Sequence, residues 1–151
     1  MPNRQLDRQF KLDWVTKDTI YKEADIISLH LPLTNLTHNM IKEDHLRMMK
    51  KNAIIINTSR GGIINENDLY SVMQSGHLLG SAIDVFEKEP YAGPLKEINR
   101  CILTSHMGSM SEDCRERMEI EAVENAIRYL SNMPLLGPVP ESEFNIQSQK
   151  L

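Results

Sequence analysis

The chain has 151 residues, which is long enough for one domain with a hydrophobic core. Hydrophobic residues make up 40% and charged residues 25% of it, a balance typical of soluble globular proteins. The net charge is −4 and no cluster of Lys and Arg stands out, so the sequence argues against a nucleic-acid partner. No apolar run approaches the roughly 20 residues that span a bilayer, so we expect no membrane-spanning segment.

The start of the chain, residues 1–7, is polar, and we expect no signal peptide before the fold. Cys101 and Cys114 show no metal-ligand spacing, and we expect reduced thiols in a cytoplasmic protein. The spacing of His38 and His45 also matches no metal motif, so we expect no metal site.

The first half of the chain predicts two buried strands. Residues 11–15 form a weak apolar run, which we interpret as an outlying strand leading into a short helix near residues 19–23. Residues 25–30 are predicted as a strand that ends before Pro32. Residues 52–57 are predicted as a second strand, and the unbroken run of Ile suits a strand that is buried on both faces.

The second half alternates helices and strands. Asn65 is predicted to cap a helix that Gly76 ends, with Leu69, Val72 and Met73 on its inner face. Residues 78–84 and 101–104 are predicted as the third and fourth strands. The pattern favours an α/β fold in which flanking helices cover a parallel sheet.

The last predicted element is a long helix. Ser109 and Glu112 fit a capping box that would open it, and it would run to about Leu130. We interpret its apolar stripe as a core face, made of Met118, Ala122, Val123, Ala126, Ile127 and Leu130. Residues 133–140 would break the helix, and residues 141–151 would form a loose C-terminal tail.

Polar side chains with complementary chemistry follow three of the predicted strands. Arg60 follows the second strand, Asp84 ends the third with Glu89 shortly after, and His106 follows the fourth. Open parallel sheets bind ligands at these strand ends. A guanidinium can hold an anionic substrate, an imidazole can exchange a proton, and a carboxylate can tune the imidazole. Taken singly, each has a structural alternative, namely a solvated strand end, a surface acid or a structural histidine.

Four motifs, in order, resemble those of the D-isomer-specific 2-hydroxyacid dehydrogenases, which include phosphoglycerate dehydrogenase and glyoxylate reductase. They are ADIISLHLPLT at residues 24–34, INTSRGG at 56–62, DVFEKEP at 84–90 and TSHMG at 104–108. The resemblance covers residues 24–140 and implies the second half of a Rossmann-type, doubly wound NAD-binding domain. Ser105 departs from the proline usual before the histidine.

The resemblance implies a function and a set of site residues. The protein would be an NAD-dependent oxidoreductase acting on the CH–OH group of a D-2-hydroxy acid, or reducing a 2-keto acid in reverse. His106 would exchange the proton, Glu89 would orient its ring, and Arg60 would clamp the substrate carboxylate. Leu31, Thr58, Ser59, Arg60, Asp84, His106, Met107, Gly108 and Ser109 would line the NAD site.

One part of the family pattern is absent from the sequence. The Gly-x-Gly-x-x-Gly turn that cradles the pyrophosphate is missing, and so is the acidic residue that binds the adenosine ribose. We therefore expect a chain truncated at its N-terminal side, with a partial NAD-binding domain over residues 1–140. We also expect the isolated chain to be inactive. The strand at residues 25–30 would become an open sheet edge that favours self-association.

Two other classes of function stay open on the sequence alone. The chain could be a non-catalytic fragment, or a binding module of the corepressor type derived from this family. The presence of Arg60, Glu89 and His106 together favours an enzymatic ancestor. Residues 91–95 and the helix at residues 118–125 lean towards phosphoglycerate-dehydrogenase-like members, without identifying the substrate.

Overall fold

The computed structural model describes residues 4–140, so the predicted tail at residues 141–151 lies outside the described residues. The elements are, in chain order, α1 (Arg4–Phe10), α2 (Lys17–Glu23), β1 (Ile26–Leu29), α3 (Glu43–Met48), β2 (Ile54–Asn57), α4 (Glu66–Gln74), β3 (Gly80–Ile83), the 3-10 helix η1 (Pro94–Glu97), β4 (Cys101–Leu103), the 3-10 helix η2 (Met107–Ser109) and α5 (Glu112–Leu130).

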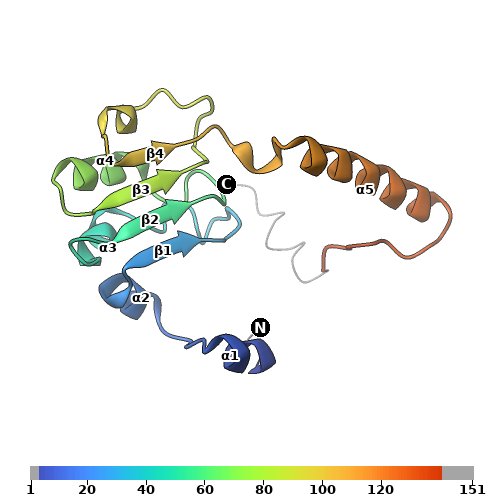
Figure 1. Cartoon of the computed structure of the whole chain (residues 1–151), viewed down its shortest axis with the longest axis horizontal. Helices are drawn as coiled ribbons and strands as arrows, with labels where there is room; N and C mark the ends of the chain where they lie inside the picture. The colour runs from blue at the N-terminus through green and yellow to red at the C-terminus, as the bar shows by residue number, and fades with distance from the viewer. Residues whose placement is uncertain (1–3, 141–151) are drawn as a thin grey trace.

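The four strands form one parallel sheet in the order β1-β2-β3-β4 (Figure 1). All four predicted strands are confirmed, each somewhat shorter than the apolar run that predicted it. The α/β fold predicted from the alternation of elements is confirmed as well. Because every strand runs the same way, the segments that follow them all emerge at one edge of the sheet.

One face of the sheet carries the hydrophobic core. Alternate strand residues such as Ile27, Ile55 and Ile83 point into it and are almost fully buried. The inner sides of α2, α3 and α4 cover them, with buried Tyr21, Leu46, Leu69, Val72 and Met73. The helices α3 and α4 are held together by the Asp68 carboxylate, which accepts from Glu43 N at 3.0 Å.

The opposite face of the sheet is open within residues 4–140. Ile26 is 59% exposed and Ile102 is 68% exposed, and Ile54 and Ile56 between them are only partly buried. The prediction that the strand at residues 52–57 is buried on both faces is therefore wrong for the described part of the chain. No described helix packs against this face, so a run of Ile that suits double burial is buried on one side only.

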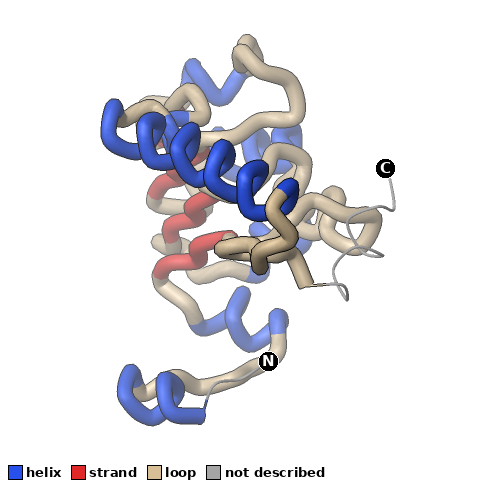
Figure 2. The backbone as a smooth tube through the Cα atoms, turned by 90° about the vertical axis from the view of Figure 1, so that its right-hand side faces the viewer, coloured by secondary structure: helices blue, strands red, loops and turns tan. Residues whose placement is uncertain are grey.

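Helix α5 leaves the sheet instead of packing on it (Figures 1 and 2). Val123 and Ile127 of its apolar stripe are 60% and 54% exposed. The prediction that this stripe is a core face is thus wrong, because an apolar period shows which side of a helix is apolar but not what lies opposite it. The helix ends at Leu130, as predicted. No helix among residues 4–140 is long and apolar enough to cross a membrane.

Two local predictions are wrong at helix starts. Residues 11–15 form no strand; they follow α1, which the sequence did not predict, and Trp14 is 69% exposed. Within the described part of the chain, residues 11–15 pair with no strand of the sheet. The capping box at Ser109 does not form either, because Ser109 ends η2 and α5 starts at Glu112 after Ser111.

The helix α4 begins and ends as predicted. Asn65 Oδ1 accepts from Asp68 N at 3.1 Å and so caps its first turn. Gly76 follows the helix at φ +77, a left-handed conformation that glycine adopts without strain. This helix matters for the site, because its first turn faces the loop that follows β3.

Candidate active site

The turn after β2 is shaped by a buried asparagine. Asn57 is 2% exposed, and its Oδ1 accepts from Ser59 N at 3.1 Å and from Ser59 Oγ at 2.8 Å. Its Nδ2 donates to Arg60 O at 2.9 Å. One side chain therefore holds both residues of the turn and fixes where Arg60 leaves the sheet. The Arg60 guanidinium is exposed and donates from Nη1 to Ser59 O at 2.7 Å.

Gly61 allows this turn to touch the loop that follows β3. A Cβ at this position would lie 2.0 Å from Phe86 C and 2.5 Å from Glu87 N, both backbone atoms. Only a residue without a side chain permits this approach. The close contact brings the residue after Arg60 against the residues just before Glu89.

We predict that Gly61→Ala destabilises the chain. A methyl group inside van der Waals distance of backbone atoms forces the two loops apart, at a cost of about 1–3 kcal/mol. Chemical denaturation of both proteins measures the difference in the free energy of unfolding. Gly137→Ala serves as the matched control, because a Cβ there would meet nothing within 4 Å. Equal stability of the two variants would contradict the prediction.

Glu89 and His106 form a pair across the strand ends. His106 Nδ1 lies 3.1 Å from Glu89 Oε2, and the other carboxylate oxygen accepts from Phe86 N at 3.0 Å. The hydrogen bond from Phe86 N, followed by that from His106, holds the pKa of the Glu89 carboxyl below its usual value. Glu89 therefore stays ionised at neutral pH and holds the imidazole by one ring nitrogen. The ring's other nitrogen is left to face the cleft.

His106 has a left-handed backbone, with φ 54 and ψ 55. Such a conformation is uncommon for a residue other than glycine and concentrates at functional sites. His106 N donates to Asp84 O at 2.8 Å, which ties the turn after β4 to the end of β3. The backbone thus places the ring beside the Glu89 carboxylate.

The Asp84 side chain also holds the turn of His106 through hydrogen bonds. Its Oδ1 accepts from Thr104 Oγ1 at 2.5 Å and from Met107 N at 2.9 Å, and the residue is 9% exposed. Burial alone would raise the pKa of the Asp84 carboxyl. The hydrogen bonds from Thr104, Met107 and His106, with the His106 charge, hold that pKa below its usual value instead. The carboxylate is therefore a fixed negative charge at the end of β3, beside the turn of His106.

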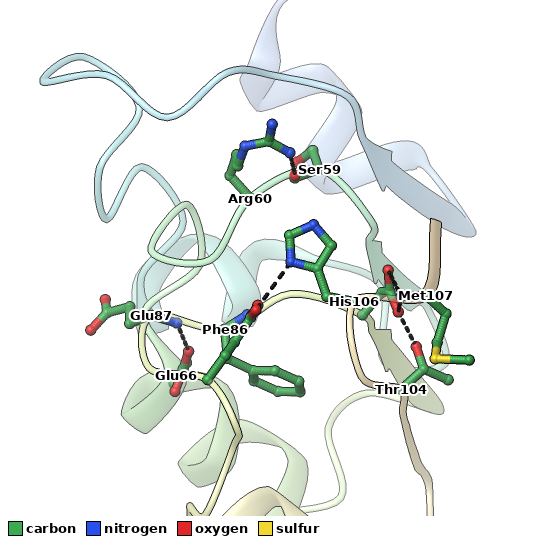
Figure 3. A network of polar contacts seen from close by, with 10 residues as sticks. Ser59, Arg60, Glu66, Phe86, Glu87, Thr104, His106 and Met107 are labelled. Atoms are coloured by element: carbon green, nitrogen blue, oxygen red, sulfur yellow. Dashed lines mark hydrogen bonds and ion pairs between the residues drawn. The ribbon is translucent and has the colours of Figure 1, made fainter. Parts of the chain in front are cut away.

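The three predicted catalytic side chains meet at one cleft. A cavity of about 470 Å³ is lined by Arg60, Glu89 and His106. Figure 3 shows Arg60 and His106 reaching the same region from the segments after β2 and β4. A cation, an imidazole and a carboxylate in one cleft can bind a small anion and exchange a proton with it.

A second cavity adjoins the first at Arg60. It has a volume of about 520 Å³ and is lined by four predicted cofactor residues, Leu31, Thr58, Ser59 and Arg60. Asp84 and Met107 are joined to each other at the neighbouring strand end. Gly108 and Ser109 lie in η2 and line neither of the two cavities. Asp84 and Met107 also line neither cavity, so among the predicted cofactor residues the two cavities contain Leu31, Thr58, Ser59, Arg60 and His106.

The donor set fits the nicotinamide end of NAD. Asp84 Oδ2 accepts from Met107 N at 3.1 Å, and a carboxylate oxygen retains capacity to accept a further bond from a carboxamide. The sequence provides no Gly-rich turn to hold the pyrophosphate. Among residues 4–140 no cluster of three or more His, Cys, Asp or Glu could hold a metal ion.

Sequence reasoning missed part of this site. His38, considered from the sequence only as a possible metal ligand, lines the catalytic cleft together with Leu33 and Glu87. The Gly61-Gly62 pair is the sequence signal that could have pointed to a close backbone approach, although not to the segment involved. No local pattern marked His38, because its position depends on the long segment that returns from β1 to α3.

The comparison with protein families identifies the family of the chain. The family model described as "D-isomer specific 2-hydroxyacid dehydrogenase, NAD binding domain" matches residues 2–108 of the chain. The chain belongs to this family. The predicted family is therefore confirmed, together with the Rossmann-like α/β fold and NAD as the cofactor of this domain. The match begins well before residue 24, where the recognisable motifs start.

Similar proteins of this dehydrogenase family carry reductase names. The glyoxylate reductase of Thermococcus litoralis is 39% identical over 142 residues, which are 93% of this chain and 41% of that protein. The hydroxypyruvate reductase of Thermotoga maritima is 40% identical over 79% of this chain and 40% of that protein. A solved glyoxylate reductase from Paecilomyes thermophila superposes with a TM-score of 0.85 at 31% identity, over 94% of this chain and 43% of that one. The chain spans about two fifths of the length of the relatives it matches.

Proposed function

We propose that the chain forms the catalytic, nicotinamide-proximal part of an NAD-dependent oxidoreductase that reduces a small 2-keto acid to a D-2-hydroxy acid. Arg60 binds the substrate carboxylate, His106 gives a proton to the carbonyl oxygen, and Glu89 holds the His106 ring. NADH, when bound, supplies the hydride. The proposal rests on one observation, namely that Arg60, Glu89 and His106 line the same cleft beside the cavity of Leu31, Thr58 and Ser59.

The charges of the cleft suit this chemistry. The exposed Arg60 guanidinium presents a planar set of donors that matches a carboxylate. His106 would give its proton to the substrate oxygen, and Glu89 would stabilise the protonated imidazole before that transfer. Asp84 would hold the carboxamide of the nicotinamide through its carboxylate. Glyoxylate and hydroxypyruvate are the proposed substrates, because two of the relatives are named glyoxylate reductase and hydroxypyruvate reductase.

The competing proposal is a binding module without catalysis. It requires no particular geometry between Glu89 and His106, whereas the carboxylate holds one ring nitrogen at 3.1 Å. Such a pair serves proton transfer, and it favours the enzymatic proposal. We also propose a cytoplasmic location, where the free thiols of Cys101 and Cys114 remain reduced.

The test measures oxidation of NADH in the presence of glyoxylate. We expect the chain by itself to be inactive, because without the Gly-rich turn it lacks several charge-assisted hydrogen bonds worth about 1.5–3 kcal/mol each. The completed enzyme is defined as this chain joined to the part of the Thermococcus litoralis glyoxylate reductase that it does not cover. It is expected to reduce glyoxylate. A folded completed enzyme that binds NADH but reduces neither glyoxylate nor hydroxypyruvate would refute the proposal.

We further propose that the chain associates with itself through β1 and the open face of the sheet. This strand pairs on one side only within residues 4–140, and Ile26 is 59% exposed on it. Exposed apolar strand edges favour pairing with another chain. Sedimentation over a range of concentrations is expected to show dimers or larger species, and Ile26→Lys is expected to shift them towards monomer.

Leu36→Lys is the matched control for self-association. Leu36 is 84% exposed in the loop after β1, so the variant adds the same charge away from the sheet. Its sedimentation is expected to equal that of the parent chain. A folded parent chain that stays monomeric at high concentration would contradict the proposal.

A further inference from the structure

The loop that carries Glu89 is fastened by two carboxylates that accept from consecutive backbone amides. Phe86 N donates to Glu89 Oε1 at 3.0 Å, within the loop itself. The next amide, Glu87 N, donates to Glu66 Oε1 at 2.7 Å (Figure 3). Glu66 is 21 residues away in sequence, at the first position of α4. The loop is thus tied to the body of the domain by a side chain outside the catalytic cleft.

The helix that bears Glu66 is itself firmly placed. Leu69, Val72 and Met73 of α4 are almost fully buried in the core. Asn65 caps the first turn and also donates from Nδ2 to Asn39 Oδ1 at 3.2 Å. A carboxylate on this turn is therefore a rigid point from which to hold a loop.

A simpler role for an acid at this position is to stabilise the helix by its charge. Acidic side chains near a helix N-terminus interact favourably with the helix dipole. Asp68, in the same turn, is also acidic, and its carboxylate accepts from Glu43 N of α3. The Glu66 carboxylate instead accepts from the catalytic loop, and no ion pair joins it to a described cation. Its direction towards the loop needs its own explanation.

We propose that Glu66 is a positioning residue, which holds the loop at Phe86–Glu89 and thereby sets the Glu89 carboxylate against His106. The proposal rests on the proposed function, in which this pair transfers the proton. The chain of contacts is continuous, from Glu66 to Glu87 N, through the adjacent peptide to Phe86 N and Glu89, and on to His106 Nδ1. The stacked rings of Phe86 and Tyr91, 4.2 Å apart, close the loop on its other side.

The surroundings of Glu66 show that this contact is not incidental. Burial raises the pKa of the Glu66 carboxyl, the bond from Glu87 N opposes that rise, and the Glu87 charge adds to it. The phenol of Tyr91, whose own pKa is raised mainly by burial and partly by the Glu66 charge, lies in the same pocket, as does Lys88. The hydrogen bond from Glu87 N therefore offsets part of the cost of burying the charged Glu66 carboxylate beside another acid.

Two variants of Glu66 separate the positioning role from a charge effect. Glu66→Gln removes the charge but keeps an oxygen that can accept from Glu87 N. Glu66→Asp keeps the charge at the start of α4 but is one methylene too short to reach the loop. NMR of the 151-residue chain follows the titration of the Glu89 carboxyl and hydrogen exchange at the Glu87 amide. In Glu66→Asp we expect the Glu89 pKa to rise towards its usual value and exchange at Glu87 N to accelerate.

In Glu66→Gln we expect both NMR signals to stay close to those of the parent chain. In the completed enzyme, Glu66→Asp is expected to lower kcat about tenfold with little change in KM, because a displaced proton-transfer pair slows chemistry more than binding. Asp68→Ala is the matched control, since it removes an acid from the same turn that holds α3. It is expected to lower stability while leaving the Glu89 pKa and kcat unchanged.

The reverse pattern would overturn the proposal. A damaging Glu66→Gln and a tolerated Glu66→Asp would assign Glu66 to the helix dipole. An unchanged Glu89 titration in a folded Glu66→Asp chain would also refute it. Failure of the completed parent enzyme to reduce glyoxylate would instead count against the proposed function, because the NMR readout does not depend on turnover.

Discussion

Replacing His106 by Asn in the completed enzyme is expected to lower kcat for glyoxylate about 10²–10⁴-fold, the usual contribution of a general acid. The substitution is chosen because the residue has a left-handed backbone at φ 54, which Asn adopts more readily than most residues. The backbone bond from residue 106 to Asp84 O should therefore persist, and the loss reports on the missing imidazole. Steady-state kinetics with NADH and glyoxylate, combined with NADH fluorescence titration, measure turnover and cofactor binding separately.

His38→Asn is the control for this variant. His38 lines the same cleft, but the hydrogen bonds between its ring and Asn39 Nδ2 are long, at 3.4 and 3.5 Å. Its replacement is expected to change kcat little. If His106→Asn kept most of the parent activity, or if His38→Asn lost as much, the proton would have to come from another group.

Arg60→Lys is expected to reduce kcat/KM for glyoxylate about 10- to 150-fold, with most of the change in KM. Lysine keeps the positive charge but loses the planar fork that pairs with a carboxylate, and a charge-assisted hydrogen bond is worth about 1.5–3 kcal/mol. Arg60→Met, which also removes the charge, should lose more. The kinetic parameters of the three proteins, measured over a range of glyoxylate concentrations, give the comparison.

Arg47→Met controls for the general loss of an arginine. Arg47 pairs with Glu43 at 2.7 Å along α3, in a surface ion pair that contributes little to stability. Its kinetic parameters are expected to match those of the parent enzyme. An unchanged KM in Arg60→Lys and Arg60→Met would remove Arg60 from the proposed substrate site.

The structure brings Arg60, Glu89 and His106 to one cleft because of their positions after the strands. Arg60, Asp84 and His106 each follow an apolar run, and parallel strands bring their carboxyl ends to one edge. Asn57 was read only as the end of a strand, although its buried side chain shapes the turn of Arg60. The contact of Glu66 was not predicted either, because its partner Glu87 lies in a loop 21 residues away and no local pattern relates the two.

The local pattern of α5 predicted the helix but not whether its apolar side is buried. Its apolar stripe predicted a helix correctly, since periodicity is a property of the segment itself. Whether that stripe is covered depends on what the rest of the fold places opposite it, and here Val123 and Ile127 remain more than half exposed. The same reason explains why the Ile run of β2 is fully buried on one side only.

The sequence by itself determined the family, the parallel α/β sheet and the chemical identity of the three groups at its strand ends. These follow from short motifs, from apolar periodicity and from the residues that start and end strands and helices, all of which are features of single segments. Only the tertiary structure decided that Glu66 accepts from Glu87 N, that Gly61 contacts the neighbouring loop and that α5 stands clear of the sheet. Such contacts join residues distant along the chain, so they are set by packing geometry, which no single segment contains.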